Sequence, residues 1–183
     1  MAQAERTPFR IFRAADAPSL EDSGAMHYEA IEEGVATQVE RLREAGIDDG
    51  HRVKMLFSMP GVSLSHSWFK CGFPLPLHSH DSDCLYYIVA GSLRLGTETL
   101  GPGDGFFVPS NVPYGYTPGP DGVEILEFRH DESYNFRFSA KSGAPFWERA
   151  LQQLRDNHPV WEKALLPSEA LRRQRPIGPS PDG

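Results

Sequence analysis

The strongest structural signal in the chain is the run Gly72-Phe-Pro-Leu-Pro-Leu-His78-Ser-His80-Asp-Ser-Asp-Cys84-Leu-Tyr-Tyr-Ile-Val-Ala-Gly91. His78 and His80 lie two residues apart, and side chains two apart on a β-strand share a face. Their Cα atoms would be about 7 Å apart in a strand that rises about 3.4 Å per residue. Two imidazoles placed in this way can bind one metal ion, although two ordinary strand histidines give the same pattern.

The glycines, histidines and cysteine of this run follow a regular spacing. Five residues separate Gly72 from His78, one separates His78 from His80, three separate His80 from Cys84, and six separate Cys84 from Gly91. A second block follows, Gly103-Asp-Gly-Phe-Phe-Val-Pro109-Ser-Asn111-Val-Pro-Tyr114. In their order and short separation the two blocks resemble the two motifs of the cupin family.

The resemblance implies an all-β fold with flanking helices, built as a cupin barrel (a double-stranded β-helix, jelly-roll-like). It also implies a metal site, which in this family usually has three histidines and one glutamate. His78 and His80 match the first two histidine positions. Cys84 stands at the glutamate position, and Tyr114 stands at the third histidine position. Half of the usual ligand set is therefore replaced.

Cys84 and Tyr114 each have two interpretations. A Cys84 thiolate would favour zinc, copper or iron, whereas most free cysteines are small buried hydrophobic residues. Tyr114 could bind a metal as phenolate or act as an acid, or it could be a core tyrosine with a bonded hydroxyl. We predict metal ligands at His78, His80 and Cys84, a catalytic role for Tyr114, and one divalent transition metal (iron, zinc, nickel or copper).

Three further side chains are candidates for the site. Glu124 and Glu127 lie on the strand expected after the second block. One has an even and the other an odd residue number, so their side chains should lie on opposite faces of the strand and one of them should point inward. His66, on the strand before the first block, could supply a third imidazole, although a lone strand histidine is more often structural.

The chain divides into four predicted parts. Residues 1–50 are an N-terminal extension with one amphipathic helix, from about Met26 to Ala45, because apolar residues recur there at helical spacing. Residues 51–140 hold many short strands, which are typical of a sandwich or barrel. Turns are expected there at Gly91-Ser92 and over 118–122. Residues 141–175 are C-terminal helices, with a break at Pro159 and a cap at Ser168, and residues 176–183 are a disordered tail.

Composition excludes several classes of protein. The net charge of −7 argues against a broad nucleic-acid surface. No apolar run approaches the roughly 20 residues that a membrane-spanning helix needs. The N-terminus lacks a signal-peptide core, so we expect a cytoplasmic protein, and its two cysteines do not indicate a disulfide scaffold. The apolar helical faces at both ends would suit a homodimer, which is common among cupins.

Three functions are consistent with these features. We favour a metal-dependent cupin enzyme that acts on a small organic molecule inside the barrel, by dioxygenase, isomerase or lyase chemistry. The loss of two usual ligands leaves open a metal-free cupin that binds a small molecule as a sensor or carrier. A third possibility is a metal-free enzyme that uses His78 or His80 with Tyr114 as base and acid.

Overall fold

Two β-sheets form the body of the protein in the computed structural model, which describes residues 8–139 and 142–174. The larger sheet has the strand order β2-β3-β8-β5-β6, and β7 also pairs with β5. Its strands are β2 (His51–Met59), β3 (Val62–Phe69), β5 (Cys84–Leu95), β6 (Glu98–Leu100), β7 (Gly105–Val108) and β8 (Thr117–Arg129). The smaller sheet has the order β1-β9-β4 and consists of β1 (Met26–Tyr28), β9 (Tyr134–Phe138) and β4 (His78–Ser79). A mostly β fold with flanking helices is therefore confirmed.

The strands do not close into one hydrogen-bonded barrel over the described residues, and this corrects the prediction of a closed barrel. They form two separate sheets. The approach to β4 contains Pro74 and Pro76, which have no N–H to donate to a ladder, and β4 itself has only two residues. β4 is joined to the β7–β8 connection by reciprocal backbone hydrogen bonds between His78 and Tyr114, of 3.1 and 2.9 Å.

Two expected turns are instead parts of long strands. β5 runs through Gly91-Ser92, and its pairing with β8 shifts register between Ile88 and Ala90 and again between Gly91 and Leu93. β8 likewise includes the whole of 118–122. Gly91 has φ 72°, and a Cβ there would collide with the backbone oxygen of Gly122. The irregular part of the β5–β8 pairing therefore needs glycine at position 91.

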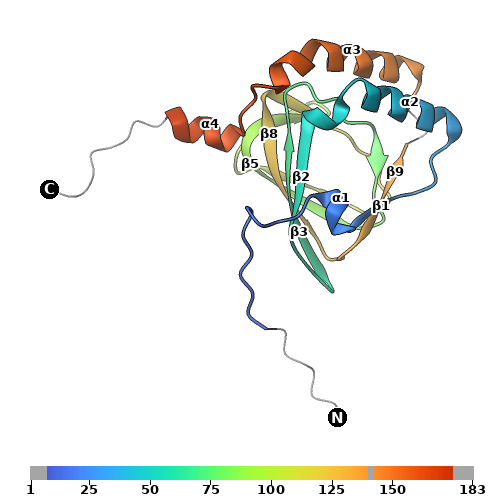
Figure 1. Ribbon diagram of the computed structural model, residues 1–183. Helices are drawn as coiled ribbons and strands as arrows, with labels where there is room; N and C mark the ends of the chain where they lie inside the picture. Colours follow the sequence, from blue (N-terminus) through green and yellow to red (C-terminus); the bar gives the residue numbers. More distant parts are fainter. Residues whose placement is uncertain (1–7, 140–141, 175–183) are drawn as a thin grey trace.

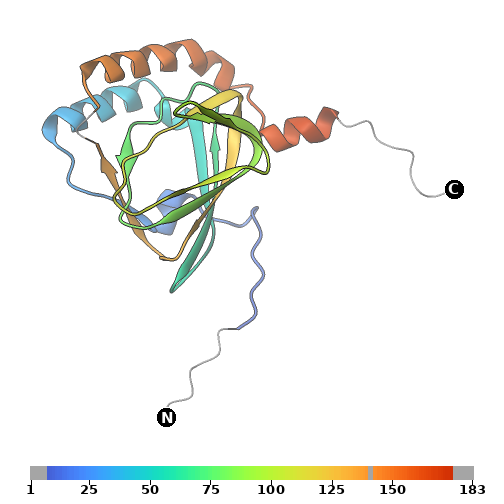
Figure 2. The same ribbon diagram turned by 180° about the vertical axis from the view of Figure 1, so that it is seen from behind.

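Four α-helices lie around the sheets, namely α1 (Leu20–Ser23), α2 (Glu33–Glu44), α3 (Ala144–Trp161) and α4 (Pro167–Gln174). α2 and α3 run side by side over one end of the sheets in both views (Figures 1 and 2), and Arg41 Nη1 lies 3.0 Å from Glu148 Oε1 between them. The helix expected from Met26 begins only at Glu33, because Met26–Tyr28 pairs in parallel with β9 as β1.

The C-terminal helices also differ from expectation. Pro159 lies inside α3 rather than ending it, and the helix continues to Trp161, whose side chain is fully buried against the core. Ser168 is not an N-cap, because α4 already begins at Pro167. Its N–H donates to Glu124 Oε1 at 2.6 Å, so the carboxylate on β8 anchors the first turn of α4.

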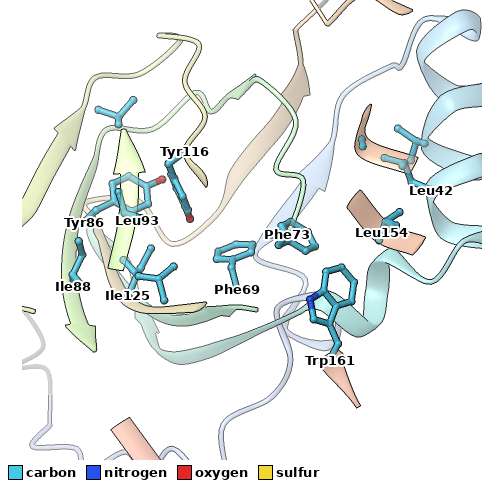
Figure 3. Packing of buried hydrophobic residues seen from close by; sticks show 14 of the residues in the cluster. Leu42, Phe69, Phe73, Tyr86, Ile88, Leu93, Tyr116, Ile125, Leu154 and Trp161 are labelled. Atoms are coloured by element: carbon cyan, nitrogen blue, oxygen red, sulfur yellow. The ribbon is translucent and has the colours of Figure 1, made fainter. Parts of the chain in front are cut away.

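One hydrophobic cluster extends from the inner face of the large sheet to the helices. Figure 3 shows Ile88 and Ile125 at the strands, Phe69 and Phe73 next to them, and Trp161, the last residue of α3, beyond Phe73. The cluster joins the large sheet to α2 and α3. None of the helices in the described part of the chain is both long and apolar enough to cross a membrane.

Leu154 on α3 tests this packing, because its side chain is completely buried. We expect Leu154→Ala to lower the free energy of unfolding by about 2–5 kcal/mol, through lost apolar burial and the cavity that remains. Val160→Ala on the same helix is the control, since Val160 is 53% exposed, and should change it by no more than about 0.5 kcal/mol. Urea unfolding measures both, and equal effects would contradict the packing described.

Candidate functional site

His78 and His80 are buried side by side on and just after β4. Their ring centroids are 5.1 Å apart, with the ring planes at 74°, so the prediction that they share a face is confirmed. The ring of Phe136 on β9 stacks on His78 at 4.5 Å. β4 and β9 thus hold both imidazoles against the inner surface of the small sheet.

Each imidazole is oriented by a backbone carbonyl. His78 Nδ1 lies 2.8 Å from the oxygen of Pro76, and His80 Nδ1 lies 2.5 Å from the oxygen of Asn135. A carbonyl oxygen can only accept, so each Nδ1 carries the proton and each Nε2 keeps its lone pair. Metal-binding histidines have the same arrangement, because a bonded Nδ1–H orients the ring and leaves Nε2 to the metal.

Both imidazoles remain uncharged at neutral pH. Burial, with the neighbouring His80 as a smaller cause, lowers the pKa of His78 to about 3. Burial followed by the positive charge of Arg129 lowers the pKa of His80 to about 4. Neutral imidazoles suit metal binding, whereas such low pKa values make weak general bases near pH 7. The predicted alternative of a histidine base therefore has little support here.

A cavity of about 140 Å³ opens beside the two histidines. An engineered apolar cavity of about 150 Å³ binds benzene, so this volume suits a small organic molecule. Most of its wall is apolar or aromatic, contributed by Leu20, Met26, Tyr28, Val39, Leu42, Ile47, Val53, Phe69, Phe73, Leu75, Pro76, Tyr116, Tyr134, Phe136 and Phe138. Its polar lining includes His78, His80, Tyr114, Glu127 and Arg129. A mostly apolar pocket with a few polar groups is typical of small-molecule sites.

Tyr114 lies against the first histidine. Its backbone pairs with His78, and the two rings are 4.4 Å apart. Its hydroxyl shares a short hydrogen bond with the hydroxyl of Tyr86. Burial, with the negative charge of Glu127 as the next cause, raises the pKa of Tyr114 far above its ordinary value. Tyr114 therefore keeps its proton and can act as a hydrogen-bond donor.

The opposite parity of Glu124 and Glu127 places them on opposite faces of β8, as predicted. Glu127 lines the cavity. Glu124 faces the outside of the sheet, where His66 Nε2 lies 3.1 Å from its Oε2 and Ser168 donates to both of its oxygens. His66 is thus a partner of Glu124 and does not line the cavity.

Arg129 is a site residue that the sequence analysis missed. Its Nη2 lies 2.9 Å from Glu127 Oε2 and 3.3 Å from the Tyr86 hydroxyl, and its guanidinium lies 3.9 Å from the centre of the Tyr134 ring. Arg129 has the same parity as the buried apolar residues Val123 and Ile125 of β8. A charged residue in an inward register was the sequence signal that could have found it.

Cys84 is almost completely buried in the hydrophobic cluster, and burial raises the pKa of its thiol to about 12. Its thiol does not line the cavity. Over residues 8–139 and 142–174, no three His, Cys, Asp or Glu side chains lie together in a way that could hold a metal ion. The two histidines fit a metal by their tautomer, but a third protein ligand is not gathered with them. Cys84 as a ligand stays a prediction.

Comparison with known proteins gives solved structures only, since no family model and no curated protein matches the chain. The structure of KdgF from Halomonas sp. matches at 18% identity over 67% of this chain and 94% of that one, with a TM-score of 0.45. The polyketide cyclase RemF from Streptomyces resistomycificus matches at 22% identity over 57% and 84%, with a TM-score of 0.47. An RmlC-like cupin from Shewanella frigidimarina matches at 21% identity over 70% and 93%, with a TM-score of 0.43. The third of these structures is named as a cupin, the family whose two motifs the sequence resembles.

The lowered histidine pKa values predict a stability that depends on pH. In the unfolded chain a histidine takes up its proton near pH 6.5, whereas the folded protein resists this until about pH 4 at His80 and pH 3 at His78. The unfolded state therefore binds more protons in this window, and the free energy of unfolding falls as the pH drops from about 6.5 to 4.

Urea unfolding at several pH values measures this dependence. We expect His78→Gln and His80→Gln each to flatten the fall of stability between about pH 6.5 and 4 relative to the unaltered protein. His27→Gln removes an exposed histidine and serves as the control. Equal slopes in all four proteins would contradict the buried, uncharged histidine pair.

Proposed function

We propose that the protein binds a small organic molecule in the cavity between its two sheets. The observation that supports this is the cavity itself, which is apolar over most of its wall and carries His78, His80 and Tyr114 among its few polar groups. The apolar wall would bury the body of the molecule, and the polar groups would orient it.

We further propose that the two Nε2 atoms hold one divalent transition metal and that the protein is a metal-dependent enzyme of dioxygenase, isomerase or lyase type. The Nδ1–carbonyl hydrogen bonds of His78 and His80 support this, because both rings already have the tautomer that a metal requires. When bound, such a metal would supply a Lewis acid for an oxygen atom of the molecule.

The residues around the pair would serve the reaction in separate ways. Tyr114, still protonated and 4.4 Å from the His78 ring, would donate a hydrogen bond or a proton to the bound molecule. Phe136, stacked on His78, would keep water away from that side of the imidazole. Arg129 and Glu127 neutralise each other and would leave this end of the cavity without net charge.

A metal-free cupin that binds the same kind of molecule is the second candidate. The specific observation in its favour is that no third His, Cys, Asp or Glu of the described residues joins His78 and His80. Two neutral imidazoles alone would hold a divalent ion weakly, and both Nε2 atoms would then accept hydrogen bonds from the ligand instead.

The predicted homodimer and cytoplasmic location stay predictions. The outer face of the large sheet supports self-association, since Leu85, Tyr87 and Phe107 are each about half exposed on neighbouring strands. Exposed apolar patches of this kind commonly mark interfaces.

Metal analysis separates the two candidates. The protein is purified without a histidine tag, and its metal content is counted by mass spectrometry. We expect a stoichiometric transition metal that is lost in both His78→Ala and His80→Ala, because each removes one of two imidazole ligands. A chelator should lower the melting temperature of the unaltered protein, since a metal bound only by the folded state stabilises it.

Two further variants complete the metal analysis. His158→Ala is the matched control and should keep its metal, because His158 contacts Asp49 and does not line the cavity. Cys84→Ser tests the predicted thiol ligand. Loss of the metal in this variant would support Cys84 as a ligand, whereas a retained metal would show that the buried thiol, which does not line the cavity, is not one. Metal content that is low and unchanged in His78→Ala would reject the metal-dependent enzyme and leave the metal-free cupin.

A further inference from the structure

A chain of hydrogen bonds leads from the buried ion pair to the cavity. Arg129 Nη2 lies 3.3 Å from the Tyr86 hydroxyl, which in turn bonds to the hydroxyl of Tyr114. Tyr86 is buried and does not line the cavity, whereas Tyr114 does. The chain therefore ends at the group that faces a bound molecule.

The cation beside Tyr86 favours one direction for these bonds. A guanidinium has N–H donors and no acceptor, so the Tyr86 oxygen must accept from Arg129. This hydrogen bond from a cation polarises the Tyr86 O–H and makes it the stronger donor of the two tyrosine hydroxyls. Donation from Tyr86 to the Tyr114 oxygen is therefore favoured, and in that arrangement the proton of Tyr114 is not used in this bond.

A second acceptor for the Tyr86 hydroxyl is the Cys84 sulfur, with which it also has a hydrogen-bonding interaction. Sulfur is a weak acceptor, and the phenolic oxygen of Tyr114 is a better one. The Tyr86 proton is therefore donated to the Tyr114 oxygen in preference to the Cys84 sulfur. The hydroxyl proton of Tyr114 can then turn into the cavity, beside His78.

The charges around the cavity limit which ligand groups can accept a hydrogen bond from the Tyr114 hydroxyl. The charged side chains of the lining are Glu21, Arg43, Glu127 and Arg129, with as many acidic as basic groups. Arg129, the cation beside the tyrosine pair, is already bonded to Glu127 at 2.9 Å. In the protein without a metal, an anionic ligand group beside Tyr114 would lose its water without gaining a free counter-ion, which is costly.

We propose that Tyr86 is a positioning residue, held by Arg129, that directs the Tyr114 hydroxyl proton into the cavity to recognise an uncharged carbonyl-type oxygen of the ligand. The proposal rests on the small-molecule cavity proposed above and specifies the class of its ligand. It applies to the protein without a metal, in which the Tyr114 hydroxyl donates to the ligand beside the two Nε2 acceptors of His78 and His80.

Three probes of similar size test the ligand class, and ligand-observed NMR titration gives their affinities. Acetophenone carries the carbonyl, α-methylstyrene has a methylene group in its place, and benzoate carries a negative charge. We expect acetophenone to bind up to about tenfold more tightly than α-methylstyrene, which corresponds to about 1.4 kcal/mol. Benzoate should bind more weakly than acetophenone. Benzoate binding the most tightly of the three would overturn the ligand class.

Three Tyr→Phe variants test the direction of the bonds. Tyr114→Phe should abolish the preference for acetophenone. Tyr86→Phe should reduce it, because the Tyr114 proton loses the donor that keeps it turned toward the ligand. Tyr87→Phe, on the same strand but facing outward, should leave the preference unchanged. A preference that rises in Tyr86→Phe would show that Tyr114 donates to Tyr86, and the proposal would be wrong.

A measurement without ligand tests the orientation of the two hydroxyls independently of whether the cavity binds a small molecule. In protein with ¹³C-labelled tyrosine, the low-field hydroxyl proton of the Tyr86–Tyr114 bond should correlate with the Cζ carbon of Tyr86. Correlation with Tyr114 Cζ would overturn the proposed direction. Failure of all three probes to bind, together with a proton on Tyr86, would reject the small-molecule cavity and retain the orientation of the hydroxyls.

Discussion

The ion pair between Glu127 and Arg129 constrains the interior of this protein more than any apolar contact does. Both side chains are nearly excluded from water, with exposed fractions of 10% and 1%. Removing one partner of such a pair leaves a buried charge without compensation, at a cost of about 3–5 kcal/mol. Ser67 donates to the carboxylate, and the guanidinium donates to Tyr86 and lies over Tyr134. The surrounding residues are therefore held in place by the need to satisfy two buried charges.

Strand β8 shows how one element builds both the core and the candidate site. Its inward residues Val123 and Ile125 are completely buried in the hydrophobic cluster, and the next two inward residues are Glu127 and Arg129. The apolar side chains of β8 pack against other apolar residues, whereas Glu127 and Arg129 at the end of the strand must keep their hydrogen bonds. The single strand β8 thus contributes both to the hydrophobic cluster and to the polar part of the cavity lining.

Much of this arrangement was predictable from local rules. Alternation on a strand places His78 beside His80 and separates Glu127 from Glu124, and both predictions hold. The same rule would have marked Arg129, whose inward register follows from Val123 and Ile125. Local rules failed where distant residues decide the outcome. Met26–Tyr28 looks helical, but its pairing with β9 makes it a strand. Gly91 and Gly122 look like turns, but they touch each other across two strands and let both continue.

The sequence by itself determined the β-rich fold, the cupin-like motif and the shared face of the two histidines, because each depends on residue spacing along one strand or turn. Only the tertiary structure decided what surrounds them. It set Cys84 in the hydrophobic cluster and out of the cavity lining, brought Arg129 and Glu127 to the cavity from a different strand, and joined Tyr86 to Tyr114. Alternation along β8 gives the inward direction of Glu127 and Arg129, but contacts such as that between Tyr86 and Tyr114 join residues far apart in the chain, so no local pattern encodes them.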